Sequence, residues 1–217
     1  MANTITGGTT VTTPSSEEVA LCNSALLRAG ITKQITSLDG TDNLSVTCNS
    51  EYEQLRDFLL EEHPWQFATK YDDIDAADAT NPEWYWSYRY ALPADCILLL
   101  GLEAEGIPYE QADDGFIYTN EGAPLKIKYI SKETAVSKMP NSFKQALITK
   151  LAAVLALGLT KDARRVEYLE SRYDRLIADA RFADSGKRSA QPLDSSAYQD
   201  ARYIGPDAVD NHGDLNY

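Results

Sequence analysis

The stretch LLEEHPWQFATKYDDID, from Leu59 to Asp75, contains the point where a helical pattern gives way to a strand pattern. Pro64 has no amide proton and disfavours helical geometry at His63, so a helix is expected to end there. Residues that alternate as in a strand begin at Trp65. We therefore expect His63, Pro64 and Trp65 to stop the helix, with the Trp65 indole as an apolar plug beneath the helix ends.

Two helices are expected on the N-terminal side of this stretch. The first covers about residues 15–30, where Ser15 and Glu18 have the spacing of a capping box and Gly30 supplies a left-handed stop. The second covers about residues 43–63, because its apolar residues recur at three- and four-residue spacing. This apolar row consists of Cys48, Tyr52, Leu55 and Leu59.

Residues 65–130 follow a strand pattern. Between Pro124 and Ile130 apolar residues alternate with two lysines, which is typical of a half-exposed antiparallel sheet. The residues at 120–123 have the composition of a hairpin turn, so we expect the segments 115–119 and 124–130 to pair with each other.

Helical periodicity returns in about residues 141–158 and again in about residues 161–183. The chain is therefore predicted to be mostly α with a small antiparallel β part, an α+β fold. Its core is expected to resemble a four-helix bundle with β-hairpins attached. This single domain covers residues 15–184, between a flexible arm at 1–14 and an extended tail at 185–217.

The composition is that of a globular protein, with 43% apolar and 24% charged residues, and the net charge is −13. Between Lys70 and Gly122 twelve acidic residues are opposed only by Lys70 and Arg89, a net charge of −10. A protein that grips nucleic acid needs a basic surface to displace counterions from phosphates. High-affinity binding to DNA or RNA is not expected.

No membrane association is expected either. The richest apolar run, from Ala146 to Leu159, is shorter than the roughly 18–20 residues of a membrane helix and contains a lysine. The N-terminus lacks the basic start and apolar centre of a signal peptide, so synthesis in the cytoplasm is expected. The three cysteines form no CxxC pair and are expected to be reduced core residues. They are Cys22, Cys48 and Cys96.

The sequence contains no nucleotide-binding glycine loop, zinc-protease motif, nucleophile elbow or EF-hand loop. Its two histidines, His63 and His212, do not indicate a metal site, and no cofactor is expected. Glu61 and Glu62 do not face His63 on a helix, so a catalytic role for His63 is not predicted. Paired carboxylates of the kind that cleave glycosides remain an alternative, because acids abound in the middle segment.

Several short motifs occur in an order that resembles the head-to-tail adaptor family of tailed bacteriophages, also called tail tubular protein A or tail accessory factor. The resemblance covers about Glu17 to Ala183, and no single motif in it is specific. The motifs are Cys22–Gly30, Ile35–Gly40, His63–Ala68, Tyr90–Cys96 and Lys128–Ile130, followed by FKQAL and LAAVLA in the third expected helix.

The resemblance implies a structural virion protein at the head–tail junction, not an enzyme. Such adaptors form a twelve-subunit ring between the portal protein and the tail nozzle or tail tube. The ring continues the channel through which DNA passes without specific binding. The C-terminal segment extends along the portal in this family, which assigns portal contact to residues 185–217, with Tyr198, Arg202 and Tyr203 as the first residues to test.

Acidic channel walls would let DNA slide past, because phosphates find no cations there. We therefore expect part of the acid-rich segment to face the channel. A virion-associated cell-wall or polysaccharide hydrolase is the alternative function, and a regulatory or scaffolding protein of host origin is a third. The possible channel-facing acids are Asp72, Asp73, Asp75, Asp113 and Asp114.

Overall fold

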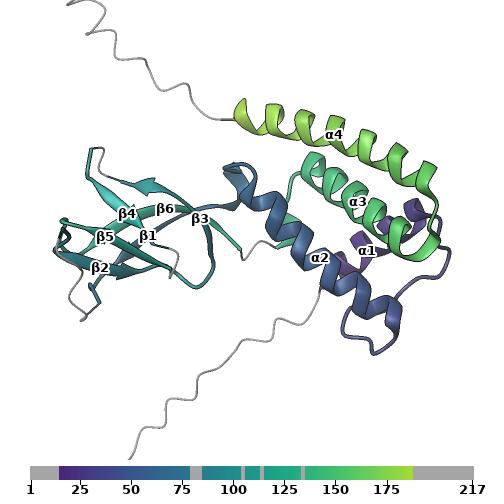
Figure 1. Cartoon of the computed structure of the whole chain (residues 1–217), viewed down its shortest axis with the longest axis horizontal. Coiled ribbons are helices and arrows are strands. Elements are labelled where there is room, and N and C mark those ends of the chain that lie inside the picture. The colour runs from purple at the N-terminus through teal and green to yellow at the C-terminus, as the bar shows by residue number, and fades with distance from the viewer. Residues whose placement is uncertain (1–14, 79–84, 104–105, 113–114, 133–134, 188–217) are drawn as a thin grey trace, which may run out of the picture.

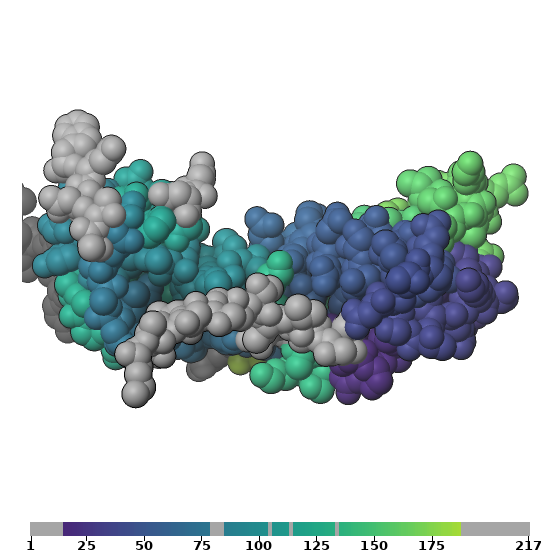
Figure 2. Space-filling view, turned by 90° about the horizontal axis from the view of Figure 1, so that it is seen from below, coloured from purple at the N-terminus to yellow at the C-terminus, as the bar shows by residue number. Residues whose placement is uncertain are grey.

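A computed structural model describes the chain in five stretches. In the described part, four α-helices form one end of an elongated molecule and two small antiparallel sheets form the other (Figures 1 and 2). The predicted α+β fold class is confirmed. The described residues are 15–78, 85–103, 106–112, 115–132 and 135–187, so the expected arm at 1–14 and nearly all of the expected tail lie outside them.

The first two helices have the ends that their sequences predict, with one correction. Helix α1, Ser16–Ala29, starts with the expected capping box between Ser15 and Glu18 and ends at Gly30, whose φ is +88°. Helix α2, Asn43–Glu61, is capped by the Asp42 side chain. It ends two residues earlier than predicted, because Pro64 disturbs the last turn before the chain reaches it.

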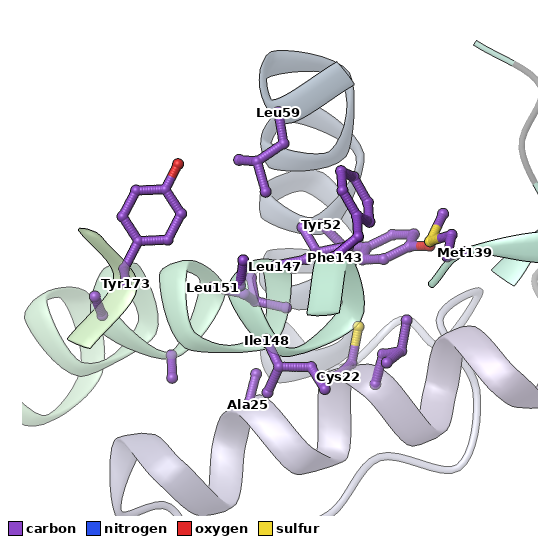
Figure 3. Close-up of a cluster of buried hydrophobic side chains, with 14 of the residues drawn as sticks. Cys22, Ala25, Tyr52, Leu59, Met139, Phe143, Leu147, Ile148, Leu151 and Tyr173 are labelled. Carbon is purple, nitrogen blue, oxygen red and sulfur yellow. The ribbon is translucent and has the colours of Figure 1, made fainter. Parts of the chain in front are cut away.

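Helix α3, Asn141–Leu155, lies at the centre of the helical part and packs against α1, α2 and α4. Figure 3 shows its side chains Phe143, Leu147 and Leu151 among residues of all three neighbours. Each buried side chain of this size stabilises the fold by about 1.5–3 kcal/mol. The neighbours' contributions include Cys22 and Ala25 from α1, Tyr52 and Leu59 from α2, and Tyr173 from α4.

The chain beyond Leu155 corrects the predicted end of the third helix. Residues Ala156–Thr160 form a π-helical turn that continues α3, and Lys161 then adopts a left-handed conformation with φ of 54°. Helix α4, Ala163–Ser185, follows with Asp162 as its cap.

This continuation also corrects the prediction about apolar length. The helix from Asn141 to Thr160 has 20 residues and a mean hydropathy of 1.4, so by length and composition it passes the test for a membrane span. Over its most apolar window 56% of the residues are buried inside the protein, as in the central helix of a globular core.

The β part consists of two three-stranded antiparallel sheets. One has the strand order β1-β6-β3 and the other β2-β5-β4. The strands are β1 (Thr69–Ile74), β2 (Tyr88–Ala91), β3 (Cys96–Leu102), β4 (Tyr109–Gln111), β5 (Phe116–Thr119) and β6 (Leu125–Ser131).

The expected hairpin around residues 120–123 is wrong. Strands β5 and β6 flank this turn but belong to different sheets, β5 pairing with β2 and β4, and β6 with β1 and β3. The physical reason is a second core between the sheets, to which the buried faces of both strands contribute. Its residues are Tyr90, Leu99, Ile117, Leu125, Ile127 and Tyr129.

The expected strand start at Trp65 is also wrong. Residues Gln66–Ala68 form a 3-10 turn, and β1 begins at Thr69. The Thr69 hydroxyl donates to the Trp65 carbonyl at 2.7 Å, which closes this turn. In β6 the predicted alternation is present, with Leu125 and Ile127 buried and Lys126 exposed between them.

Candidate functional site

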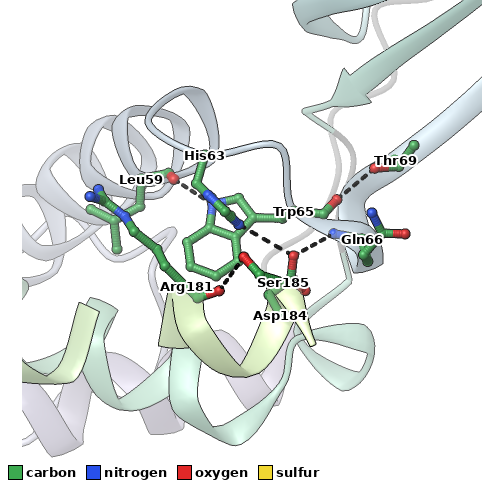
Figure 4. Close-up of polar contacts among 8 residues, drawn as sticks. All are labelled: Leu59, His63, Trp65, Gln66, Thr69, Arg181, Asp184 and Ser185. Atoms are coloured by element: carbon green, nitrogen blue, oxygen red, sulfur yellow. Dashed lines mark hydrogen bonds and ion pairs between the residues drawn. The ribbon is translucent and has the colours of Figure 1, made fainter. Parts of the chain in front are cut away.

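The residues His63, Pro64 and Trp65 lie between α2 and β1, at the joint between the helical part and the β part. Figure 4 shows His63 and Trp65 there. Trp65 is 1% exposed, and its indole N–H donates to the Leu59 carbonyl at 2.7 Å. Its ring also packs edge-on against Phe143 of α3, with centroids 5.0 Å apart. The indole therefore fills the space beneath the end of α2 and satisfies one of the helix's last carbonyls.

Sequence reasoning missed the acid that meets His63. Asp184, near the end of α4, is 2% exposed, and its Oδ2 lies 3.5 Å from His63 Nε2. The same oxygen accepts a hydrogen bond from the Gln66 backbone N–H at 3.0 Å (Figure 4). No local pattern could reveal this contact, because Asp184 is 118 residues away from Gln66 in the chain.

A second polar contact joins the same two helices. Arg181 Nη2 lies 2.7 Å from Glu62 Oε2, and the Tyr173 hydroxyl donates to that oxygen at 3.3 Å. Burial raises the pKa of the Tyr173 hydroxyl, and the neighbouring Glu62 charge raises it further. The nearby Ser185 hydroxyl donates to the Arg181 carbonyl at 2.8 Å, so it caps its own helix. These contacts fix the end of α4 against the joint.

Asp95 anchors the neighbouring sheet at the start of β3. Its carboxylate accepts hydrogen bonds from Lys70 of β1 at 2.7 Å and from Ser131 and Tyr129 of β6 at 2.9 and 3.1 Å. Burial alone would raise the pKa of Asp95, but the hydrogen bonds from Lys70 and Ser131 outweigh it and hold the pKa below its usual value. Asp95 thus ties three strands together.

The structure brings only some of the predicted site residues together. Asp72 and Asp73 are adjacent exposed residues of β1, and Asp75 is exposed just beyond the strand. Asp113 and Asp114 lie outside the described residues. The expected portal contacts Tyr198, Arg202 and Tyr203 lie outside them as well.

A pocket that the sequence reasoning did not identify lies at the far end of the helical part, where α1 ends and α4 begins. Its volume is about 590 Å³, and Leu169 forms part of its wall. Four arginines gather there in a protein whose net charge is −13. The other residues that line it are Arg28, Asp162, Arg164, Arg165, Tyr168 and Arg172.

The arginines of the pocket are positioned from two helices. The Arg165 guanidinium lies directly over Gly30, where an added Cβ would collide with its Nη1. Arg28 donates to the Gln145 side chain and to Thr149 Oγ1, both on α3. Burial lowers the pKa of Arg28, and the positive charge of Arg172 lowers it further. The pocket therefore holds positive charge that an anion would stabilise.

A partial signal for this pocket is present in the sequence. Arg165, Tyr168, Leu169 and Arg172 have helical spacing and fall on one face of α4. That face resembles an ordinary solvated helix surface until Arg28, from α1, is placed beside it. Only the packed structure supplies this fourth arginine.

Within the described part of the chain, no group of three or more histidine, cysteine or acidic side chains has the geometry to hold a metal ion. The cysteines are free thiols, as expected, with Cys22 and Cys48 buried and Cys96 half-buried. Burial raises the pKa of Cys22 to about 12 and those of Cys48 and Cys96 to about 11. Thiols with such pKa values are weak nucleophiles at neutral pH.

Comparison with known proteins adds no assignment. No protein-family model matches the chain, and no curated protein matches it significantly.

Proposed function

We propose that this protein is a structural virion component, a head-to-tail adaptor without enzymatic activity. Twelve copies assemble into a ring between the portal protein and the tail nozzle or tail tube, and the ring continues the DNA channel. The proposal starts from the motifs between Glu17 and Ala183 that resemble this family.

One observation carries the proposal: the two ends of an elongated molecule differ in surface chemistry. The acid-rich β part forms one end, and the end of α1 and the start of α4 lie at the far end of the helical part (Figure 1). These two helix ends line the arginine pocket. Surfaces at opposite ends of one chain meet only between copies. A head-to-tail contact of this kind generates a ring when its rotation closes.

The joint between the two parts also supports a structural role. Buried Trp65 and Asp184 connect α2, α4 and the start of the β part through hydrogen bonds of 2.7–3.0 Å. A ring subunit needs such a joint, because its two binding ends must keep a fixed relation to each other. His63 takes part in this joint beside Trp65, with ring centroids 4.7 Å apart, which favours a structural role over catalysis.

Passage of DNA without specific binding fits the charge of the chain. With a net charge of −13, the ring repels phosphates, and acids of the segment between Lys70 and Gly122 line part of the channel. Portal contact is assigned to residues 185–217, with Tyr198, Arg202 and Tyr203 as its first candidates. The mature location is the head–tail junction of the virion, after synthesis in the host cytoplasm.

Light scattering and sedimentation with the purified portal protein test this proposal. We expect the isolated protein to be monomeric or weakly associated, because its binding surface is incomplete until the portal templates it. We expect it to co-sediment with the portal as a large complex. Stable rings without portal would contradict the templating step. Failure to bind the portal, together with hydrolysis of cell-wall polysaccharide that one carboxylate substitution abolishes, would favour the hydrolase instead.

A further inference from the structure

We propose that the arginine pocket at the junction of α1 and α4 is the socket of the ring interface, and that it receives strand β1 of the neighbouring copy. Asp72 and Asp73 of that copy, whose side chains leave opposite faces of the strand, then pair with Arg165 and Arg172 on either side of the strand edge. This inference rests on the proposed ring and names the contact that holds it together.

The pocket contains more positive charge than its own residues neutralise. Among the described residues, Arg164 and Arg172 have no acid within ion-pair distance. Arg28 donates its hydrogen bonds to two uncharged side chains of α3. The nearest acid to Arg165 is Asp162, at 3.8 Å. Guanidinium groups bind carboxylates in a planar, two-pronged geometry, so this cluster is suited to two incoming aspartates.

The surface around the pocket has the composition of a protein interface. Tyr168 is 62% exposed, and Leu27 and Leu157 at the same end of the helical part are 66% and 62% exposed. Exposed tyrosine and arginine together are enriched where proteins meet. A small free anion would leave these apolar side chains in water, whereas a protein segment would cover them.

Strand β1 has the complementary properties. It is an edge strand of its sheet, paired with β6 on one side only in the described structure. Tyr71 is 72% exposed on it, and the exposed Asp72 and Asp73 follow directly. An edge strand of this kind is a surface that natural proteins cover, and a neighbouring copy supplies the cover.

A second copy is the occupant that the charges favour. The segment from Lys70 to Gly122 has a net charge of −10, and the exposed Asp72 and Asp73 belong to it, whereas the lysines of the adjacent strand β6 are already engaged, Lys126 by Glu103 and Lys128 over the Tyr71 ring. Nucleic-acid phosphates would also bind arginines, but the rest of the molecule repels them. The inference moves Asp72 and Asp73 from the channel wall to the subunit interface and leaves the channel to other acids of the segment.

Charge exchange tests the contact. The variant Arg165→Glu/Arg172→Glu is expected to bind portal yet form rings at least about tenfold less well, since like charges now face each other. Adding Asp72→Lys and Asp73→Lys to the same chain restores opposite charges and should restore the rings. Arg175→Glu, an exposed arginine of α4 outside the pocket, is the matched control and should form rings normally.

If the fourfold variant stays as defective as the double variant while the wild type forms rings, the pocket inference is overturned and the adaptor proposal stands. The pocket would then serve another anion, such as a DNA phosphate.

Disulfide trapping tests the same contact without portal. Protein carrying Asp72→Cys is mixed with protein carrying Tyr168→Cys at high concentration and oxidised. The native thiols have raised pKa values and should react slowly. A mixed dimer is expected, and Arg175→Cys in place of Tyr168→Cys should give none. Equal trapping at both positions would overturn the inference whatever the protein does with portal.

Discussion

Asp184 is the residue whose role depends most on the folded structure. It is buried at the end of α4, accepts the Gln66 backbone N–H at 3.0 Å and lies 3.5 Å from His63 Nε2. A buried backbone donor without an acceptor is costly, so this carboxylate fixes the turn that leads from α2 into β1.

We therefore predict that Asp184→Ala lowers the free energy of unfolding by about 1–3 kcal/mol, because the Gln66 N–H loses its acceptor. Asp184→Asn keeps an oxygen for that hydrogen bond and should cost clearly less. Urea denaturation followed by circular dichroism measures both. Equal losses for the two variants would show that the hydrogen bond to Gln66 is not what Asp184 contributes.

Asp95 predicts a pH dependence. Its folded-state pKa lies below the ordinary value despite burial, because Lys70 and Ser131 hydrogen-bond to the ionised form. A lowered carboxyl pKa contributes stability that is complete at neutral pH and is lost as the pH falls through the folded-state pKa. The stability advantage of the wild type over Asp95→Asn should therefore shrink as the pH is lowered from 7 to about 3.

Urea denaturation at several pH values measures this difference. Asp75→Asn, which removes the same charge from an exposed position, is the control. If Asp95→Asn unfolds with the same difference from wild type at every pH, the ionised Asp95 is not the group that anchors the sheet.

At the scale of elements, two glycines near helix ends have contrasting environments, so the same substitution to alanine should affect stability differently at each. Gly30 ends α1 with φ of +88° beneath the Arg165 guanidinium, whereas Gly158 lies in the π-helical turn with open space around it. Gly30→Ala should lower the free energy of unfolding by about 1–2 kcal/mol, because a Cβ disfavours the left-handed conformation. Gly158→Ala should be neutral or slightly stabilising.

Thermal unfolding of the two variants measures the contrast. The Gly30→Ala side chain also displaces the Arg165 end that covers it, so ring formation should weaken along with stability. A Gly30→Ala protein as stable as the wild type would mean that α1 does not need its left-handed stop.

The helices were predictable because their signals are local. The capping box at Ser15 and the stop at Gly30 both operate within one helical turn. Strand partners were not predictable in the same way. The turn at residues 120–123 has hairpin composition, yet the strands beside it do not pair with each other: β5 pairs with β2 and with its neighbour in sequence β4, and β6 pairs with the earlier strands β1 and β3, because filling the core between two sheets outweighs a local turn.

The candidate site was less predictable than the fold. His63 and Trp65 could be identified as a helix stop from Pro64 alone, but Asp184 meets them only through the packing of α4. The arginine pocket likewise needs Arg28 beside Arg165, a contact between α1 and α4 that no periodicity encodes.

At the scale of the whole molecule, the proposed role depends on the two ends that meet between neighbouring copies and on the C-terminal tail that is proposed to bind the portal. Removing residues 188–217 leaves α4 complete, so the chain should fold normally by circular dichroism. We predict that it binds portal at least about tenfold more weakly, because the proposed anchor is gone. Tyr198→Ala/Arg202→Ala/Tyr203→Ala in the full chain should reproduce most of the loss. If the truncated protein binds the portal as tightly as the full chain, residues 188–217 are not the portal-binding segment.

The most direct measurement is an electron micrograph of the protein mixed with its portal, averaged over many particles. We predict a closed ring of twelve copies beneath the portal, joined head to tail and coaxial with the DNA channel. Particles in which the portal stays bare, or in which single copies decorate its outer surface without touching one another, would contradict the central claim that this protein works by assembling into a conduit.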